Sequence, residues 1–213
     1  MNRLLIEAYG DCPWHPHHDP LSELIAVILS QNTSDTNSGR AFDSLLSHFG
    51  DWEAVSQADA EQVEQAIHGG GLSRVKAARI LDILQRIREE RGSLDLEFLD
   101  RMPLAEAKFW LRSLPGVGPK TVGCVLLFSL GKPVLPVDTH VYRVARRVGL
   151  IANKVSVEQA HDLLEAMIPA EDIYPFHMNM VTHGRRVCKA QRPLCSDCVL
   201  RGGCAWIGCN SRN

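Results

Sequence analysis

Aromatic residues are scarce in this chain, where they make up 6% of the 213 residues. Hydrophobic residues still make up 45%, and Leu, Val, Ile and Ala supply most of the apolar mass. A chain of this size and composition buries a substantial core, as one large domain or two small ones. Long apolar runs are also missing, because the longest, Val122 to Leu130, is far short of the roughly 20 residues that span a bilayer. The sequence therefore predicts a globular protein without a membrane span.

An excess of charge of either sign is missing as well, since 23 Lys and Arg residues stand against 25 Asp and Glu residues. The formal net charge of -2 argues mildly against a nucleic-acid partner, but a local basic face is enough for phosphate contacts. The stretch from Met1 to Asp11 carries charge and lacks the pattern of a signal peptide. We therefore expect a cytoplasmic protein with no secretion or membrane signal.

The cysteines gather near the C-terminal end of the chain. Four of the seven, Cys188, Cys195, Cys198 and Cys204, fall within seventeen residues, with six, two and five residues between them. In a reducing compartment such a cluster indicates a metal site and not a disulfide framework. Zinc takes four cysteines usually as two close pairs, whereas iron–sulfur clusters take four with varied spacing. The single close pair favours a [4Fe–4S] cluster, with zinc as the alternative.

Basic residues lie between these cysteines. Lys189, Arg192 and Arg201 are accompanied there by a single acid, Asp197. A basic loop held rigid by a cluster can press on a phosphate backbone. Alternatively, the cluster has a purely structural role and attaches the C-terminal segment to the rest of the fold. The two roles are compatible, and we expect both.

The dominant pattern along the chain is helical, because apolar residues recur at spacings of three and four. We expect helices over residues 21–30, 41–49, 60–67, 75–87, 103–111, 120–130, 138–148 and 156–167. Gly69 to Gly71 predicts a break between two of them, and Gly131 to Pro136 predicts a linker between two halves. No convincing run of alternating strands is present, so the sequence predicts an all-α fold.

A glycine-rich turn over residues 114–121, Leu-Pro-Gly-Val-Gly-Pro-Lys-Thr, separates two of these helices. Gly116 and Gly118 allow backbone conformations closed to other residues, and Pro119 suits the first turn of a helix. The expected hairpin leaves free N–H groups at a helix start, which favour an anion such as phosphate. Lys120 then lies in the first turn, where a cation is disfavoured and a free amine is favoured. An ordinary turn with an exposed lysine is the alternative.

Asp138 follows the linker and begins the next predicted helix. Capping of that helix is the simplest role for its carboxylate. A carboxylate with restricted access to solvent can also stabilise a developing cation or move a proton. His140, two residues later, has a weaker case, since packed or surface histidines are commoner than catalytic ones.

Taken together, these motifs resemble the endonuclease III family of DNA glycosylases, in the helix-hairpin-helix superfamily. The hairpin, the Val137–Asp–Thr–His140 segment and the four-cysteine loop stand in the family's order, and His183–Gly184–Arg185 also fits. The likeness covers about residues 20 to 205. Each motif alone is moderately specific, and the three in order are highly specific.

The resemblance implies two helical domains with DNA in the cleft between them. One is a six-helix barrel with the hairpin (20–132), and the other (1–19 and 133–213) carries a [4Fe–4S] cluster. It implies a monomer that binds duplex DNA with a damaged base or abasic site, and is nucleoid-associated when bound. Lys120 attacks C1′ of the damaged nucleotide, Asp138 assists, and β-elimination nicks the strand. The DNA contacts implied for the rest of the site come from Gly116, Gly118, Thr121, His140 and Arg185.

The segment from Leu29 to Asp35 is also similar to the family, which commonly has a glutamine that fills the gap left by a flipped base. This chain has Gln31 and Asn32 there, and either amide can occupy the hole. This segment and residues 95–110 are more similar to plant 5-methylcytosine glycosylases of the DEMETER type, whereas His140 fits endonuclease III. We expect a glycosylase with lyase activity on oxidised or damaged pyrimidines. The alternatives are action on 5-methylcytosine, uracil or mismatched thymine, or a non-cutting DNA-binding module.

Overall fold

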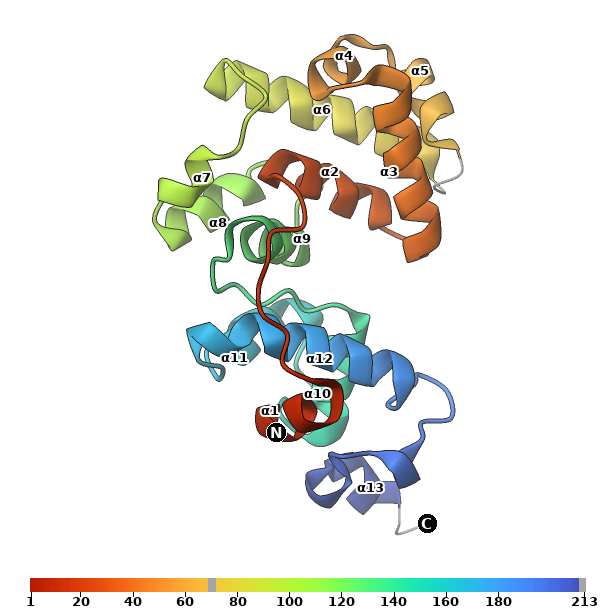
Figure 1. Cartoon of the computed structure of the whole chain (residues 1–213), viewed down its shortest axis with the longest axis vertical. Coiled ribbons are helices and arrows are strands. Elements are labelled where there is room, and N and C mark those ends of the chain that lie inside the picture. Colours follow the sequence, from red (N-terminus) through yellow and green to blue (C-terminus); the bar gives the residue numbers. More distant parts are fainter. Residues whose placement is uncertain (69–71, 211–213) are drawn as a thin grey trace. The chain divides into compact units, whose positions relative to one another are not determined.

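The computed structural model describes residues 1–68 and 72–210, with side chains as far as Ile207. The described chain consists of helices and connecting turns and contains no strand (Figure 1), which confirms the all-α prediction. It divides into two compact units. We call Pro16–Leu130 the hairpin unit, and Met1–His15 with Gly131–Asn213 the cysteine unit. None of the helices in the described ranges is both long and apolar enough to cross a membrane.

The hairpin unit is built around one buried helix, α2. Its sequence is apolar apart from a single acid and a few serines, so nearly all of its residues are buried. Asp19 starts the helix by accepting hydrogen bonds from the N–H groups of Leu21 and Ser22. The helices of this unit are α2 (Pro20–Ser30), α3 (Asp35–Phe49), α4 (Trp52–Gln57), α5 (Ala60–Ala66), α6 (Ser73–Arg91), α7 (Phe98–Arg101), α8 (Leu104–Arg112), α9 (Pro119–Cys124) and a π-helical turn (Val125–Ser129).

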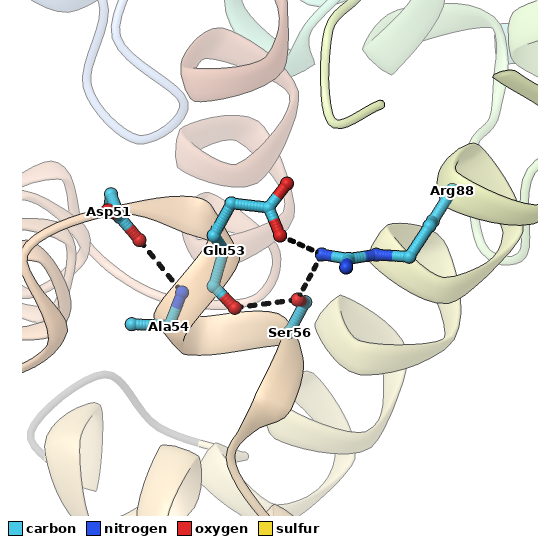
Figure 2. Close-up of polar contacts among 5 residues, drawn as sticks. All are labelled: Asp51, Glu53, Ala54, Ser56 and Arg88. Atoms are coloured by element: carbon cyan, nitrogen blue, oxygen red, sulfur yellow. Dashed lines mark hydrogen bonds and ion pairs between the residues drawn. The ribbon is translucent and has the colours of Figure 1, made fainter. Parts of the chain in front are cut away.

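Polar contacts tie α4 to α6 at the surface of the hairpin unit (Figure 2). Asp51 caps α4 through the N–H of Ala54, at 2.8 Å. Arg88 of α6 donates to the Ser56 hydroxyl at 2.6 Å and to the carboxylate of Glu53. Both charged side chains are substantially exposed, so the pair contributes at most about 1 kcal/mol to stability.

The cysteine unit combines both ends of the chain. Its helices are α1 (Asn2–Tyr9), α10 (Thr139–Val148), α11 (Val157–Glu165), α12 (Ile173–Arg186) and α13 (Ala205–Asn210), with short 3-10 turns between them. Helix α12 packs against both α10 and α1. Gly184 permits the close approach to α10, because a Cβ atom there would lie 2.8 Å from the Cβ of His140.

Most predicted helices are present, with shifted ends. The segment predicted to begin at residue 41 begins at Asp35, because Ser34 caps it through the N–H of Asn37. The predicted single helix over 120–130 changes at Val125 into a π-helical turn. The linker over 131–136 is non-helical, as predicted. Helices α1, α4, α7, α12 and α13 were not predicted, and the break predicted at Gly69–Gly71 lies outside the described residues.

Candidate active site and cysteine centre

The hairpin between α8 and α9 has the backbone that its glycines predict. Gly116 has a φ of 73°, a left-handed conformation that side chains disfavour. A Cβ atom at this position would also lie 2.3 Å from Nε of Arg79, whose side chain packs against the turn. Gly118 is the extended N-cap residue of α9, and Pro119 opens the helix. The backbone conformation therefore favours glycine at 116, and a side chain there would also displace Arg79.

Lys120 lies in the first turn of α9 and is partly exposed. Within the described part of the hairpin unit, its amine makes no hydrogen bond and no close ion pair. No side chain caps the start of α9, so the backbone N–H groups of Lys120 and Thr121 are also available. Thr121 is only 3% exposed as a whole residue, so it presents little surface for a DNA contact.

Glu23 of α2 was not singled out by the sequence analysis. Its side chain is 6% exposed, and no hydrogen-bond donor within the described residues satisfies its carboxylate. The pKa of this carboxyl is raised to about 7: burial and, to a smaller extent, the charge of Asp19 raise it, and the charge of Lys120 lowers it. An acid buried near a proposed nucleophile is a common feature of functional sites.

The two amides at the end of α2 differ in their environment. Arg79 donates to Oε1 of Gln31 at 2.7 Å, and Nε2 of Gln31 donates to the carbonyl of Gly116 at 3.4 Å. Gln31 thus links α6 to the hairpin. Asn32 has a left-handed backbone with a φ of 54°, is exposed, and makes no hydrogen bond within the described residues. Its side chain is the one of the two that is available to DNA.

Lys76 of α6 binds the C-terminal end of α2. It is buried on α6, and its Nζ donates to the carbonyl of Leu29 at 2.7 Å, in the last turn of α2. A cation at the C-terminal end of a helix interacts favourably with the helix dipole. Burial lowers the pKa of this lysine. The contact fixes the end of α2 directly before Gln31 and Asn32.

Asp138 is the N-cap residue of α10. Its Oδ1 accepts a hydrogen bond from the N–H of Val141 at 2.7 Å, which confirms the capping role. The carboxylate is partly exposed, and its second oxygen makes no hydrogen bond within the described residues. Asp138 lies in the cysteine unit and Lys120 in the hairpin unit. The cap role leaves half of the carboxylate available for chemistry.

Arg143 of α10 organises the residues around His140. It donates to the carbonyls of Gly184 at 2.8 Å and of Cys188 at 2.9 Å. Its Nη2 also donates to Nδ1 of His140 at 3.1 Å, so this ring nitrogen is an acceptor and a proton on Nε2 is available outward. Arg185, the other predicted DNA contact on this unit, is exposed.

A second arginine of α10 holds the cysteine loop. Arg147 donates to the carbonyl of Lys189 at 2.7 Å, to that of Ala190 at 2.9 Å, and to Sγ of Cys188 at 3.5 Å. The thiol of Cys204 in turn donates to the carbonyl of Arg147 at 3.4 Å. Arginine suits this task because its planar fork reaches several acceptors at once. The sequence analysis did not identify this role.

A buried histidine links the N-terminal helix to the cysteine loop. Nδ1 of His183 lies 2.8 Å from the hydroxyl of Tyr9, and Nε2 lies 3.5 Å from Sγ of Cys198. His183 is fully buried, and burial lowers its pKa, which favours the neutral ring. A Tyr9 hydroxyl that donates to Nδ1 leaves the ring proton on Nε2, facing the sulfur. In that tautomer His183 donates to Cys198, and in the other the Cys198 thiol donates to His183.

The four cysteines of the loop line one small cavity. Val148, Val187, Leu194 and Ile207 supply apolar walls, and His183 and Arg147 border it. Burial raises the pKa of the Cys198 thiol, and the charges of the other three cysteines add to that effect. Among the described residues, however, no three His, Cys, Asp or Glu side chains converge closely enough to hold one metal ion. The four cysteines therefore line one cavity, but their sulfurs do not converge on one metal position.

The helical fold and the hairpin define a class of protein, the helix-hairpin-helix proteins that repair DNA bases. The profile of the HhH-GPD superfamily of base excision DNA repair proteins matches residues 25–170. The chain belongs to this superfamily of base excision DNA repair proteins. Within the superfamily it is similar to endonuclease III.

Several relatives define this similarity. Endonuclease III of Thermotoga maritima is 35% identical over 191 residues, which cover 89% of this chain and 84% of the relative. A protein of Arabidopsis thaliana, named as a candidate DNA glycosylase, is 39% identical over 178 residues, which cover 84% of this chain. The chain spans only 58% of that plant relative. The Arabidopsis protein "Transcriptional activator DEMETER" is 32% identical over 171 residues, 72% of this chain but 9% of its own length.

Solved structures agree with this similarity. A non-covalent endonuclease III–DNA complex matches with a TM-score of 0.84 and 29% identity, over 100% of this chain and 95% of that one. A trapped covalent endonuclease III–DNA intermediate matches with a TM-score of 0.82 and 30% identity, over 99% and 95%. The endonuclease III resemblance predicted from the motifs is confirmed by these matches.

Proposed function

We propose that this chain is a bifunctional glycosylase and abasic-site lyase that removes oxidised or damaged pyrimidines from duplex DNA. The observation that carries the proposal is the placement of Lys120. Its amine lies directly after the hairpin, in the first turn of α9, without a hydrogen-bond partner in its own unit. A lysine that is not held in an ion pair is a suitable amine nucleophile.

In the proposed reaction, the Lys120 amine forms a bond to C1′ as the bond from C1′ to the base breaks. The electron pair of that bond leaves with the base, and the amine nitrogen loses a proton to give, after ring opening, an imine. Elimination then removes a proton from C2′, forms a C2′–C3′ double bond and breaks the bond from C3′ to oxygen, so that the 3′ phosphate leaves and the strand is nicked. Asp138 stabilises the cationic sugar through its uncapped oxygen. A covalent endonuclease III–DNA intermediate among the similar structures is consistent with this chemistry.

We assign the DNA contacts to both units. In the hairpin unit, the backbone at Gly116, Gly118 and Thr121 offers N–H groups to a phosphate. In the cysteine unit, His140 and Arg185 contact the duplex. We further assign the six-helix barrel to the hairpin unit and the cluster domain to the cysteine unit, and propose that the protein acts as a monomer.

We propose that Asn32, and not Gln31, fills the gap left by the flipped base. Asn32→Gly is expected to weaken binding to a lesion duplex by roughly 10-fold and to leave thermal stability nearly unchanged, because the side chain has no partner to lose and glycine accepts the left-handed backbone. Gln31→Ala breaks the link from Arg79 to the hairpin and is expected to lower the unfolding free energy by about 1 kcal/mol. Fluorescence anisotropy and thermal melting distinguish the two. The assignment is wrong if Gln31→Ala, measured as a fully folded protein, loses more affinity for the lesion duplex than the Asn32 variant does.

We propose that Cys188, Cys195, Cys198 and Cys204 hold a [4Fe–4S] cluster. A single zinc ion needs four sulfurs at about 2.3 Å from one point, whereas a four-iron cluster takes one thiolate for each iron. Sulfurs that line a common cavity without converging on one point fit the second arrangement better. When bound, the group cross-links the loop and so contributes stability to this part of the fold.

The expected metal content can be measured directly. Protein purified without oxygen should contain about four iron atoms per chain and absorb broadly in the visible range. Cys198→Ser should lose iron and melt at a lower temperature, since Cys198 lies beside the buried His183. Cys124→Ser, at a buried cysteine in the hairpin unit, is the control that should keep its iron. Stoichiometric zinc without iron would refute the cluster assignment.

A second candidate keeps the same fold and lysine but acts on 5-methylcytosine, uracil or mismatched thymine. The 32% identity to DEMETER and the asparagine at position 32 favour it. A panel of duplexes, each with one lesion, tests the choice when base release and strand nicking are scored separately. Preference for oxidised pyrimidines supports the first proposal, and preference for 5-methylcytosine or mismatches supports the second. Binding to lesions without base release or nicking would identify a non-cutting module.

A further inference from the structure

Glu23 is the least expected ionisable group in the hairpin unit. It is the single acid within the apolar sequence of α2, and its side chain is 94% buried. An ionised carboxylate with little access to water and no hydrogen bond from the protein is costly. No described residue donates a hydrogen bond to this one. A purely structural position of this kind would be better filled by leucine, so the acid needs another explanation.

The surroundings of Glu23 connect it to Lys120. Helix α2 packs against α3, α6, α9 and the π-helical turn, and α9 carries Lys120. The charged groups that act on Glu23 are Asp19, at the start of its own helix, and Lys120. The cation contributed by α6, Lys76, is bound instead to the carbonyl of Leu29 in the last turn of α2. Lys120 is therefore the cation that Glu23 faces.

We propose that Glu23 is a positioning residue that takes up the proton which Lys120 must lose before its amine attacks C1′. This inference rests on the proposed role of Lys120 as the nucleophile. The transfer converts an ammonium and a carboxylate into an amine and a carboxylic acid, so it conserves charge within the pair. Burial disfavours the charged form of Glu23, and a proton passed from Lys120 neutralises both groups in one step. A closed, DNA-bound site excludes water and favours the neutral pair further.

The inference makes a specific statement about pH. The pKa of Glu23 is raised to about 7, so the carboxylate that accepts the proton is present above that pH and is lost as the pH falls through it. The rate of adduct formation should therefore decline on the acid side of about pH 7. We call this decline the acid limb of the pH profile. Asp19 raises the pKa of Glu23, so removal of the Asp19 charge should move the acid limb to lower pH.

Single-turnover borohydride trapping on duplex DNA with an abasic site tests the inference over a range of pH. Glu23→Gln keeps the shape of the side chain and should slow trapping roughly 100-fold at neutral pH and abolish the acid limb. Glu23→Asp should restore part of the rate. Asp19→Asn keeps the cap of α2 and should retain the rate at neutral pH while shifting the limb. It also provides the test if Glu23→Gln does not fold.

The outcomes separate this inference from the function on which it rests. If the unsubstituted protein forms the adduct and Glu23→Gln keeps the same pH profile and rate, Glu23 has no part in the proton transfer. An acid limb that does not move in Asp19→Asn also overturns the inference, and leaves the lysine mechanism intact. If the unsubstituted protein forms no adduct on any lesion, the nucleophile is not Lys120 and both proposals fail.

Discussion

Lys120→Ala is expected to abolish the covalent adduct that borohydride traps between this protein and DNA with an abasic site. The imine can form only on an amine, and no other group of the hairpin turn can replace it. Base release should fall by about 1,000-fold or more if the same amine displaces the base. Thermal stability should be unchanged or slightly higher, because Lys120 makes no hydrogen bond in its unit and a cation is disfavoured at a helix start. Trapping assays, base-release assays and melting curves of the same preparation measure the three effects.

Lys154→Ala is the control for Lys120→Ala, because Lys154 is an exposed lysine in a loop of the cysteine unit. It should retain the adduct and the rate of base release. An adduct that persists in Lys120→Ala would show that another amine reacts. Loss of nicking with normal base release would restrict Lys120 to the lyase step, and would assign displacement of the base to water.

The parts of the site that the sequence predicted are those that local rules determine. The left-handed backbone at Gly116, the proline at the start of α9 and the caps at Asp138 and Ser156 each depend on a few neighbouring residues. Propensity and hydrogen-bonding capacity are sufficient to predict such features. The helix predicted over 156–167 begins with a capping box, in which Ser156 and Gln159 are partners. The cap at Ser34 follows the same rule, and its omission caused the late predicted start of α3.

The contacts that the sequence did not predict join residues far apart in the chain. Arg79 reaches Gln31, and Tyr9 reaches His183 across 174 positions. Neither pair has a fixed spacing from which a partner could be identified. Glu23 did carry a signal, since a lone acid in an otherwise apolar helix is unlike a solvated charge. Helix α12 was missed because Pro175 and several polar residues interrupt its apolar pattern, although proline is tolerated in a first turn.

The spacing of the cysteines predicts a metal site but not the side chains that hold its loop in place. The spacing indicated four thiolates for a metal site, and the structure adds the groups that hold them in place. Arg147 donates to one sulfur and His183 lies within hydrogen-bond distance of another, both from helices that lie outside the loop in sequence. Donors to a sulfur stabilise its thiolate form and fix its orientation. This support comes from α10 and α12, so no motif confined to residues 188–204 contains it.

Asp138→Asn is expected to separate the structural and chemical roles of one carboxylate. Asparagine caps a helix about as well as aspartate, so the hydrogen bond to the Val141 N–H should persist and the unfolding free energy should change by only a few tenths of a kcal/mol. The amide cannot stabilise a cationic sugar as an anion does. Single-turnover base release should therefore fall by about 100- to 10,000-fold, while the melting temperature stays nearly constant.

Two further variants complete the test of Asp138. Asp138→Ala should lose both the activity and the cap, at a cost of about 1 kcal/mol. Ser156→Ala removes the cap of α11 in the same unit and should cost a similar amount of stability with normal activity below the melting transition. If Asp138→Asn retains the rate of base release, the carboxylate only caps α10. A negative charge at position 138 would then not be needed, and the cationic sugar would have to be stabilised by another group.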